Sequence, residues 1–176
     1  MKKLLFAISL LFVSLPVSAS TEELQHKRLL NVVESLGVQV AINDSYCKKL
    51  NMFNGFYINK KKQLYICQDN SLMDGKIVEW TENDFDTIRH ETFHLIQDCI
   101  DGKLGDGKYK SFYSDDELIQ VVLDSGITMK RLQRYVNLYT ILGESSHGTM
   151  LEMEAISSSK VMSADDITEK IIDVCV

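Results

Sequence analysis

The residues His90-Glu91-Thr92-Phe93-His94 have the types and spacing of a metal site. Four residues of α-helix turn by about 400°, so two histidines four positions apart lie on one face, one turn from each other. Both imidazoles can then bind the same ion, and Zn²⁺ in tetrahedral geometry suits two histidine ligands. The pair therefore predicts a zinc site on a helix.

Glu91 follows the first histidine directly and lies at the edge of the same helix face. From there its carboxylate reaches a water at the metal rather than the metal itself. Zinc lowers the pKa of such a water toward about 7, and a nearby carboxylate can take its proton during attack on a carbonyl. Glu91 is thus the candidate general base.

The residues around this pentapeptide resemble the extended signature of the zincin metallopeptidases. That signature asks for Thr or Val three positions before the first histidine, for uncharged residues at set positions, and for a hydrophobic residue two positions after the second histidine. The matching residues are Thr87, Ile88, Thr92, Phe93, Leu95 and Ile96, with Arg89 where any residue is allowed. The resemblance implies zinc-dependent hydrolysis of peptide bonds.

Within the zincins, the third metal ligand separates the branches. Gln97 and Ile100 stand where the metzincins have Gly and His, which excludes that branch. The gluzincins take a Glu from a later helix in a Glu-x-x-Ala setting, and Glu152 and Ala155 match it. Many gluzincins carry a polar residue after this Ala to orient a ligand histidine, but here the residue is Ile156.

Two other carboxylates are alternative third ligands. Glu154 stands two residues after Glu152 and faces about 200° away from it, so only one of the two can point at the metal. Asp106 and the following Tyr109 have the interval of the aspzincin branch, without that branch's flanking glycines and threonine. Tyr135 and Tyr139 precede the glutamate helix, where a tyrosine could donate to an oxyanion, but the sequence assigns neither.

The elements that must position these residues follow from periodicity and capping. We expect a helix from Ser20 to Gly37, a strand at 38–42, and a hairpin of 56–58 with 64–66. The metal-binding helix begins at Thr81 and ends near residue 100. Helices at 114–142, interrupted near 125–126, at about 149–162 and at 163–175 follow. The order predicts an α+β fold, in which a small antiparallel sheet packs on the central HExxH helix before a helical C-terminal half.

The N-terminus predicts export. Lys2 and Lys3 precede an apolar run at 4–13 and small residues up to Ala19, as in a cleavable signal peptide over residues 1–19. An uncleaved anchor is the alternative. Residues 20–176 then form one domain, and no later run is long enough to span a membrane. The net charge of −6 becomes more negative when the two lysines are removed, which argues against a nucleic-acid partner.

All four cysteines lie in the exported part, and an even number in an oxidising compartment indicates two disulfides. Four cysteines allow three connectivities. We favour Cys47–Cys67, which closes a strand-rich segment, and Cys99–Cys175, which ties the last helix to the central one.

These observations predict an exported, periplasmic or extracellular zinc metallopeptidase that acts on peptides or proteins. His90, His94 and Glu152 bind Zn²⁺, and Glu91 is the general base. The strand at 64–67 is the expected edge that pairs with an extended substrate. The alternative is a disulfide-stabilised secreted binding protein in which the zinc site is structural or vestigial.

Overall fold

The structure, a computed structural model, describes residues 20–49, 53–100 and 102–176. The signal peptide expected over residues 1–19 lies outside the described residues. The elements are α1 (Thr21–Ser35), β1 (Gln39–Ile42), the 3₁₀ turns η1 (Ser45–Lys48) and η2 (Asn59–Lys61), β2 (Gly55–Ile58), β3 (Gln63–Ile66), α2 (Glu82–Cys99), α3 (Asp115–Asp124), α4 (Met129–Ile141), α5 (Ser146–Val161) and α6 (Ala164–Cys175). A small sheet followed by a helical C-terminal half confirms the α+β class.

The helices begin at the capping residues that the sequence contains. Thr81 accepts a hydrogen bond from the Asp84 amide, and the Asp84 carboxylate accepts one from the Thr81 amide. This reciprocal pair satisfies two of the free N–H groups at the start of α2. α5 begins three residues before the expected Thr149, because the Ser145 hydroxyl accepts from the Gly148 amide and caps the helix there.

The sheet is mixed, in the order β1-β3-β2. β2 and β3 form the expected antiparallel hairpin, with Gly55 opposite Ile66. β1 instead runs parallel to β3, with Gln39 beside Gln63, so the expectation of a wholly antiparallel sheet was wrong for this strand. Residue alternation is the same for either strand direction, and β1 and β2 lie on opposite sides of β3.

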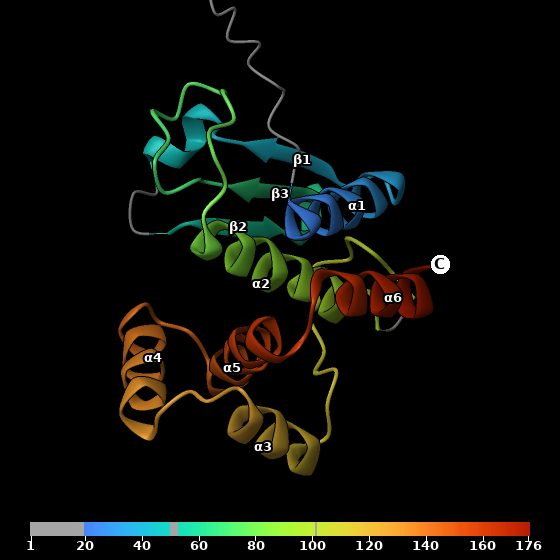
Figure 1. The fold of residues 1–176 in the computed structure, drawn as a ribbon. Helices are drawn as coiled ribbons and strands as arrows, with labels where there is room; N and C mark the ends of the chain where they lie inside the picture. The colour runs from blue at the N-terminus through green and yellow to red at the C-terminus, as the bar shows by residue number, and fades with distance from the viewer. Residues whose placement is uncertain (1–19, 50–52, 101) are drawn as a thin grey trace, which may run out of the picture.

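α2 runs between the sheet and the α3–α5 helices (Figure 1). Its buried side chains contribute to one hydrophobic core together with α1, the sheet and α6. Residues with almost no exposure include Leu29 and Val33 of α1, Leu64 and Ile66 of β3, Ile88, Phe93 and Ile96 of α2, and Ile167 and Ile171 of α6. α3 and α4 have no buried residue and lie against α5 at the periphery. The core therefore holds α2 in place from several sides.

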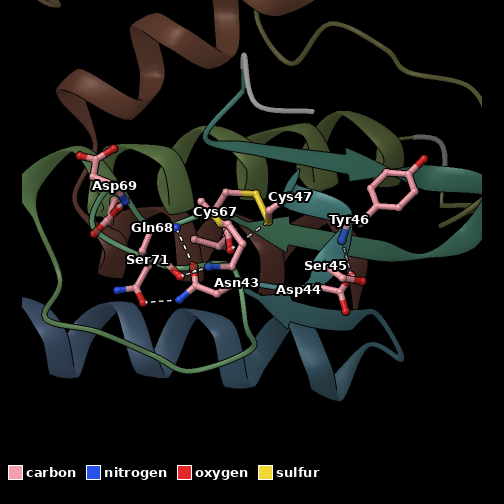
Figure 2. The surroundings of a disulfide bond; sticks show 12 residues. Asn43, Asp44, Ser45, Tyr46, Cys47, Cys67, Gln68, Asp69 and Ser71 are labelled. Carbon is pink, nitrogen blue, oxygen red and sulfur yellow. Dashed lines mark hydrogen bonds between the residues drawn. A yellow bond between two sulfur atoms is a disulfide. The ribbon is translucent and has the colours of Figure 1, made fainter. Parts of the chain in front are cut away.

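The two disulfides join Cys47 to Cys67 and Cys99 to Cys175, the pairing favoured from the sequence. The first links η1 to the end of β3, next to a buried amide pair (Figure 2). There the Asn43 side chain donates to Gln68 Oε1 at 2.8 Å and accepts from the Gln68 amide at 2.8 Å. The second links the end of α2 to the end of α6. Among the described residues, no helix is long and apolar enough to cross a bilayer.

The two disulfides should differ in their contribution to stability. They close loops with sequence separations of 76 for Cys99–Cys175 and 20 for Cys47–Cys67. In the chain-entropy account, removal of the disulfide that closes the longer loop lowers the unfolding free energy by about 4 kcal/mol, and removal of the one that closes the shorter loop lowers it by about 3 kcal/mol. We expect the Cys99→Ala/Cys175→Ala variant to lose about 1 kcal/mol more unfolding free energy than Cys47→Ala/Cys67→Ala. Urea unfolding of both variants measures this difference, and an equal or reversed loss would show that strain or native contacts outweigh loop entropy.

Candidate metal centre

α2 presents His90 and His94 on one face, as the four-residue spacing predicts. The Nε2 atoms of the two rings lie 3.2 Å apart, and the ring planes are perpendicular. The opposite faces of α2 are buried in the core through side chains such as Phe93 and Ile96, which are fully buried. Because these faces are buried, α2 cannot rotate about its axis, and His90 and His94 stay on the face where they lie.

α5 brings Glu152 to the two histidines. α5 packs on α2, and Ala155 of α5 is completely buried and small enough to allow a close approach. One Glu152 carboxylate oxygen lies 3.5 Å from His90 Nε2, and the other lies 3.5 Å from His94 Nε2. The structure thus places the carboxylate that the sequence favoured beside both imidazoles.

The charges of this group are strongly coupled. Burial by itself would raise the pKa of Glu152, but the adjacent His94 and His90 outweigh it and hold this pKa well below its usual range. Burial would likewise lower the pKa of His94, but the attraction of Glu152, together with the hydrogen bonds that Glu152 and Gln97 accept from the ring, raises it to about 9. The Glu152 carboxylate is therefore stabilised by positive charge on the histidines. A metal cation bound by the histidines can supply this charge in place of the proton on an imidazole.

Glu91 is buried beside the pair, with Oε1 3.9 Å from His90 Nε2. Burial raises the pKa of its carboxyl group above the ordinary value. His90, Glu91 and His94 offer ligand atoms that all lie within 4.8 Å of one another, so this group could hold a metal ion. Because a carboxylate with a raised pKa takes up a proton more readily, Glu91 also has the properties of a base.

Gly55 lets β2 pass close to Glu91. A Cβ atom on Gly55 would lie 2.6 Å from Thr87 Cγ2 and 2.9 Å from Glu91 Cγ, both shorter than side chains tolerate. The sequence analysis did not single out Gly55. A glycine in a strand is a known signal for close approach of another segment, and this one fits that description.

The two alternative ligands lie elsewhere. The Asp106 carboxylate accepts a hydrogen bond from the Lys108 amide at 2.8 Å and lies 3.6 Å from Lys108 Nζ, in the loop after α2. Glu154 is fully buried, and its Oε1 accepts from Ser111 Oγ at 2.8 Å and from the Phe112 amide at 2.9 Å. Neither carboxylate joins the histidine pair in the way that Glu152 does.

Tyr139 of α4 is the tyrosine that reaches the site. Burial and a hydrogen bond with the Glu152 carboxylate raise the pKa of its hydroxyl group, so the hydroxyl keeps its proton. Tyr135, one turn earlier, accepts a hydrogen bond from Arg131 Nε at 2.9 Å instead. The sequence could not choose between the two tyrosines, because the choice depends on how α4 lies against α5.

A cleft runs past the histidines on both sides. Two hollows of about 290 and 420 Å³ meet at Gly55, His90, Glu91 and Tyr139. β2 forms the sheet edge of this cleft, and β3 is paired on both sides. The expectation that residues 64–67 form the substrate-binding edge was therefore wrong, because either strand of a hairpin can be outermost until the third strand has paired.

A larger hollow of about 470 Å³ lies away from the histidine pair, between α1, β1 and the segment before α2. His26 borders it, but His26 Nδ1 contacts the Glu22 carbonyl oxygen at 2.8 Å and Nε2 contacts Arg89 at 3.1 Å. Because both ring nitrogens are already engaged within the protein, we assign the chemistry to the smaller cleft.

The polar partner of His94 was missed in the sequence. His94 Nδ1 lies 2.7 Å from Gln97 Oε1, whereas Asp98, which also follows His94 closely, accepts from Tyr57 Oη at 2.8 Å. Gln97 stands three residues after His94, and residues three apart share a helix face. That spacing was the available signal.

The geometry predicts which substitutions abolish metal binding. We expect the protein to bind one divalent transition metal ion per chain, measured by titration with Co²⁺ and its visible absorption. His90→Ala and His94→Ala should abolish binding, and Glu152→Ala should weaken it strongly, since each removes an atom of the converging group. Asp106→Ala is the matched control and should bind as wild type does. Weaker binding by Asp106→Ala with full binding by Glu152→Ala would contradict this ligand set.

The sequence of the chain matches one known protein family. The model of a domain of unknown function, DUF8637, matches residues 15–120, which is more than half of the chain. The matched segment contains the sheet and α2 with both histidines, and it ends before α4 and α5. No curated protein and no solved structure matches the chain. The protein therefore belongs to the DUF8637 family.

Proposed function

We propose that this protein is an exported zinc metallopeptidase. The observation that carries the proposal is the convergence of His90, His94 and Glu152, with Glu91 beside them in an open cleft. Three protein donors and one side open to the cleft are the usual arrangement of a catalytic zinc site, whereas structural sites are closed by four protein ligands.

The donor set fits Zn²⁺ better than Ca²⁺ or Mg²⁺. Two imidazole nitrogens and one carboxylate suit zinc, while calcium and magnesium prefer oxygen ligands alone. When bound, zinc would act as a Lewis acid on a substrate carbonyl and would make water a stronger acid. The two disulfides agree with an oxidising compartment outside the cytosol, where such bonds persist.

Glu91 would transfer the proton in this reaction. Its carboxylate accepts a proton from the attacking water and donates it to the amine that leaves when the peptide bond breaks. Burial raises the pKa of Glu91, which supports the uptake step. The position next to His90 keeps the carboxylate at the site without making it a necessary ligand.

Tyr139 would stabilise the oxyanion of the tetrahedral intermediate. Its hydroxyl group lies at the Glu152 carboxylate, borders both hollows and keeps its proton. Its one proton, which the hydroxyl donates to the Glu152 carboxylate in the substrate-free site, would turn to the oxygen on which negative charge develops.

The open edge of β2 would bind the substrate backbone. β2 pairs with β3 on one side, and its other side faces the cleft. An extended peptide can add to such an edge through main-chain hydrogen bonds, which are independent of the peptide sequence. Phe56 and Ile58 of β2 border the same hollow and would contact substrate side chains.

Glu91→Gln tests the general base. The variant keeps the size of the side chain but cannot accept the proton, so hydrolysis of peptides should fall by about 10²–10⁴-fold. Zinc content and folding should be unchanged. The measurements are cleavage of a broad peptide library by mass spectrometry and metal analysis of the same samples. Wild type should also lose activity to a chelator and regain it when zinc is added.

Two outcomes would contradict this proposal. If wild type with full zinc occupancy cleaves no peptide in the library, the alternative of a secreted binding protein with a structural zinc site replaces the peptidase. If wild type and Glu91→Gln cleave equally fast, the enzyme stands but Glu91 is not its base.

Tyr139→Phe tests the oxyanion donor. Loss of one such donor typically lowers kcat by about 10²–10³-fold, and KM should change much less because the phenyl ring still fills its place. Tyr135→Phe is the matched control, since Tyr135 bonds Arg131 rather than the glutamate. Steady-state kinetics with both variants fully loaded with zinc gives the comparison. Equal kcat values for the two variants would remove Tyr139 from the mechanism.

A further inference from the structure

A buried chain of hydrogen bonds leads from His94 into the interior of the protein. His94 Nδ1 lies 2.7 Å from Gln97 Oε1, and Gln97 Nε2 lies 3.0 Å from the Leu151 carbonyl oxygen and 2.5 Å from Glu154 Oε2. The side chains of Gln97 and Glu154 are almost completely buried. These hydrogen bonds cross from α2 to α5 beside Glu152, which Leu151 precedes by one residue and Glu154 follows by two.

The direction of these hydrogen bonds is determined by the Leu151 carbonyl group. A backbone carbonyl can only accept, so the Gln97 atom beside it must be the amide nitrogen. The Gln97 oxygen then faces His94 and also can only accept. His94 Nδ1 must therefore carry the proton, which leaves the lone pair of a neutral ring on Nε2, the atom that faces His90 and Glu152.

Glu154 fixes Gln97 in this orientation. Its Oε2 accepts from Gln97, while its Oε1 accepts from Ser111 Oγ and from the Phe112 and Tyr113 amides at 2.8–2.9 Å. Three donors on one segment thus hold the carboxylate in place. A carboxylate with one oxygen so occupied presents the other as an acceptor, which requires the Gln97 amide nitrogen to remain on its side.

We propose that Gln97 and Glu154 are positioning residues that hold His94 in the tautomer needed for metal binding. This role takes the place of the polar residue that many gluzincins carry where this chain has Ile156. The proposal rests on the proposed metal site, but it does not depend on peptide hydrolysis. Partners of this kind typically contribute about 10–100-fold to metal affinity.

Glu154→Gln replaces one acceptor of this hydrogen-bond network with a donor. The three donors at Oε1 keep the new amide oxygen on their side, so the new amide nitrogen faces Gln97 Nε2 and the two repel. Gln97 then turns or withdraws, and His94 loses its fixed acceptor. We expect Zn²⁺ affinity, measured by competition with a chromogenic chelator, to fall by about 10–100-fold.

The double variant Gln97→Glu/Glu154→Gln restores a donor–acceptor pair between positions 97 and 154 and keeps an acceptor for His94. The carboxylate introduced at position 97 accepts from His94 Nδ1 and from the side-chain amide introduced at position 154, so part of the lost affinity should return. The return is incomplete, because the Leu151 carbonyl group loses the donor that Gln97 Nε2 provides. Ser157→Ala is the matched control, because Ser157 lies on the same helix and its buried hydroxyl group makes no hydrogen bond within the described residues. This control should bind Zn²⁺ as wild type does.

Nitrogen-15 NMR of the zinc-free protein reads the tautomer directly. At a pH high enough for the imidazole ring to be neutral, wild type and the double variant should show His94 protonated at Nδ1. Glu154→Gln should show a mixture of tautomers or protonation at Nε2. This measurement holds even if wild type cleaves no peptide, so the two proposals fail separately.

Two results would overturn the inference. One is a Glu154→Gln variant with wild-type tautomer and wild-type Zn²⁺ affinity. The other is a Glu154→Gln variant that loses Zn²⁺ affinity while His94 stays protonated at Nδ1, which would make Glu154 a residue of folding alone. If Glu154→Gln does not fold, Gln97→Met provides the same test, since it removes the acceptor for His94 and leaves Glu154 with its three other donors. A Gln97→Met variant with unchanged Zn²⁺ affinity would also overturn the inference.

Discussion

The close contact between α2 and α5 is the constraint on which the site depends. Ala155 is completely buried and lies one turn from both Leu151 and Ser159, whose carbonyl groups accept hydrogen bonds from α2, so no large side chain separates the helices there. Hydrogen bonds tie α5 to α2 on both sides of Ala155. Gln97 donates to the Leu151 carbonyl group, and Arg89 donates to the Ser159 carbonyl group at 2.9 Å. Glu152 lies within this fixed stretch, which explains how its carboxylate meets both histidines.

The contact between α2 and α5 also holds two buried charged side chains, Arg89 and Glu154. Arg89 is almost completely buried, and its guanidinium group contacts the carboxylates of Asp86 and Glu82. Glu154, likewise buried, is surrounded by hydrogen-bond donors. Buried charges are costly unless they are paired or fully hydrogen-bonded. α2 and α5 are thus joined by polar contacts at both ends of the histidine pair, through Arg89 before it and through Gln97 and Glu154 after it.

Much of the fold and part of the site followed from the sequence because they depend on local rules. Capping residues marked the helix starts, and the four-residue spacing placed His90 and His94 on one face. The direction of β1 and the identity of the edge strand did not follow, since periodicity is the same in parallel and antiparallel strands. The choice between Tyr135 and Tyr139 depended on the angle at which α4 lies against α5, and no local pattern encodes that angle.

The hydrogen bond that orients His94 shows how a site can depart from the pattern of the family that it resembles. Many gluzincins carry a polar residue where this chain has Ile156, directly after Ala155, so that position does not explain the orientation of a ligand histidine. Gln97 offers an explanation from a different position, three residues along the same helix as the histidine that it contacts. An acceptor three residues along the same helix lies on the same face as its histidine and within reach of the ring. The further bond from Gln97 to Glu154 then makes that orientation depend on the same helix contact that brings in Glu152.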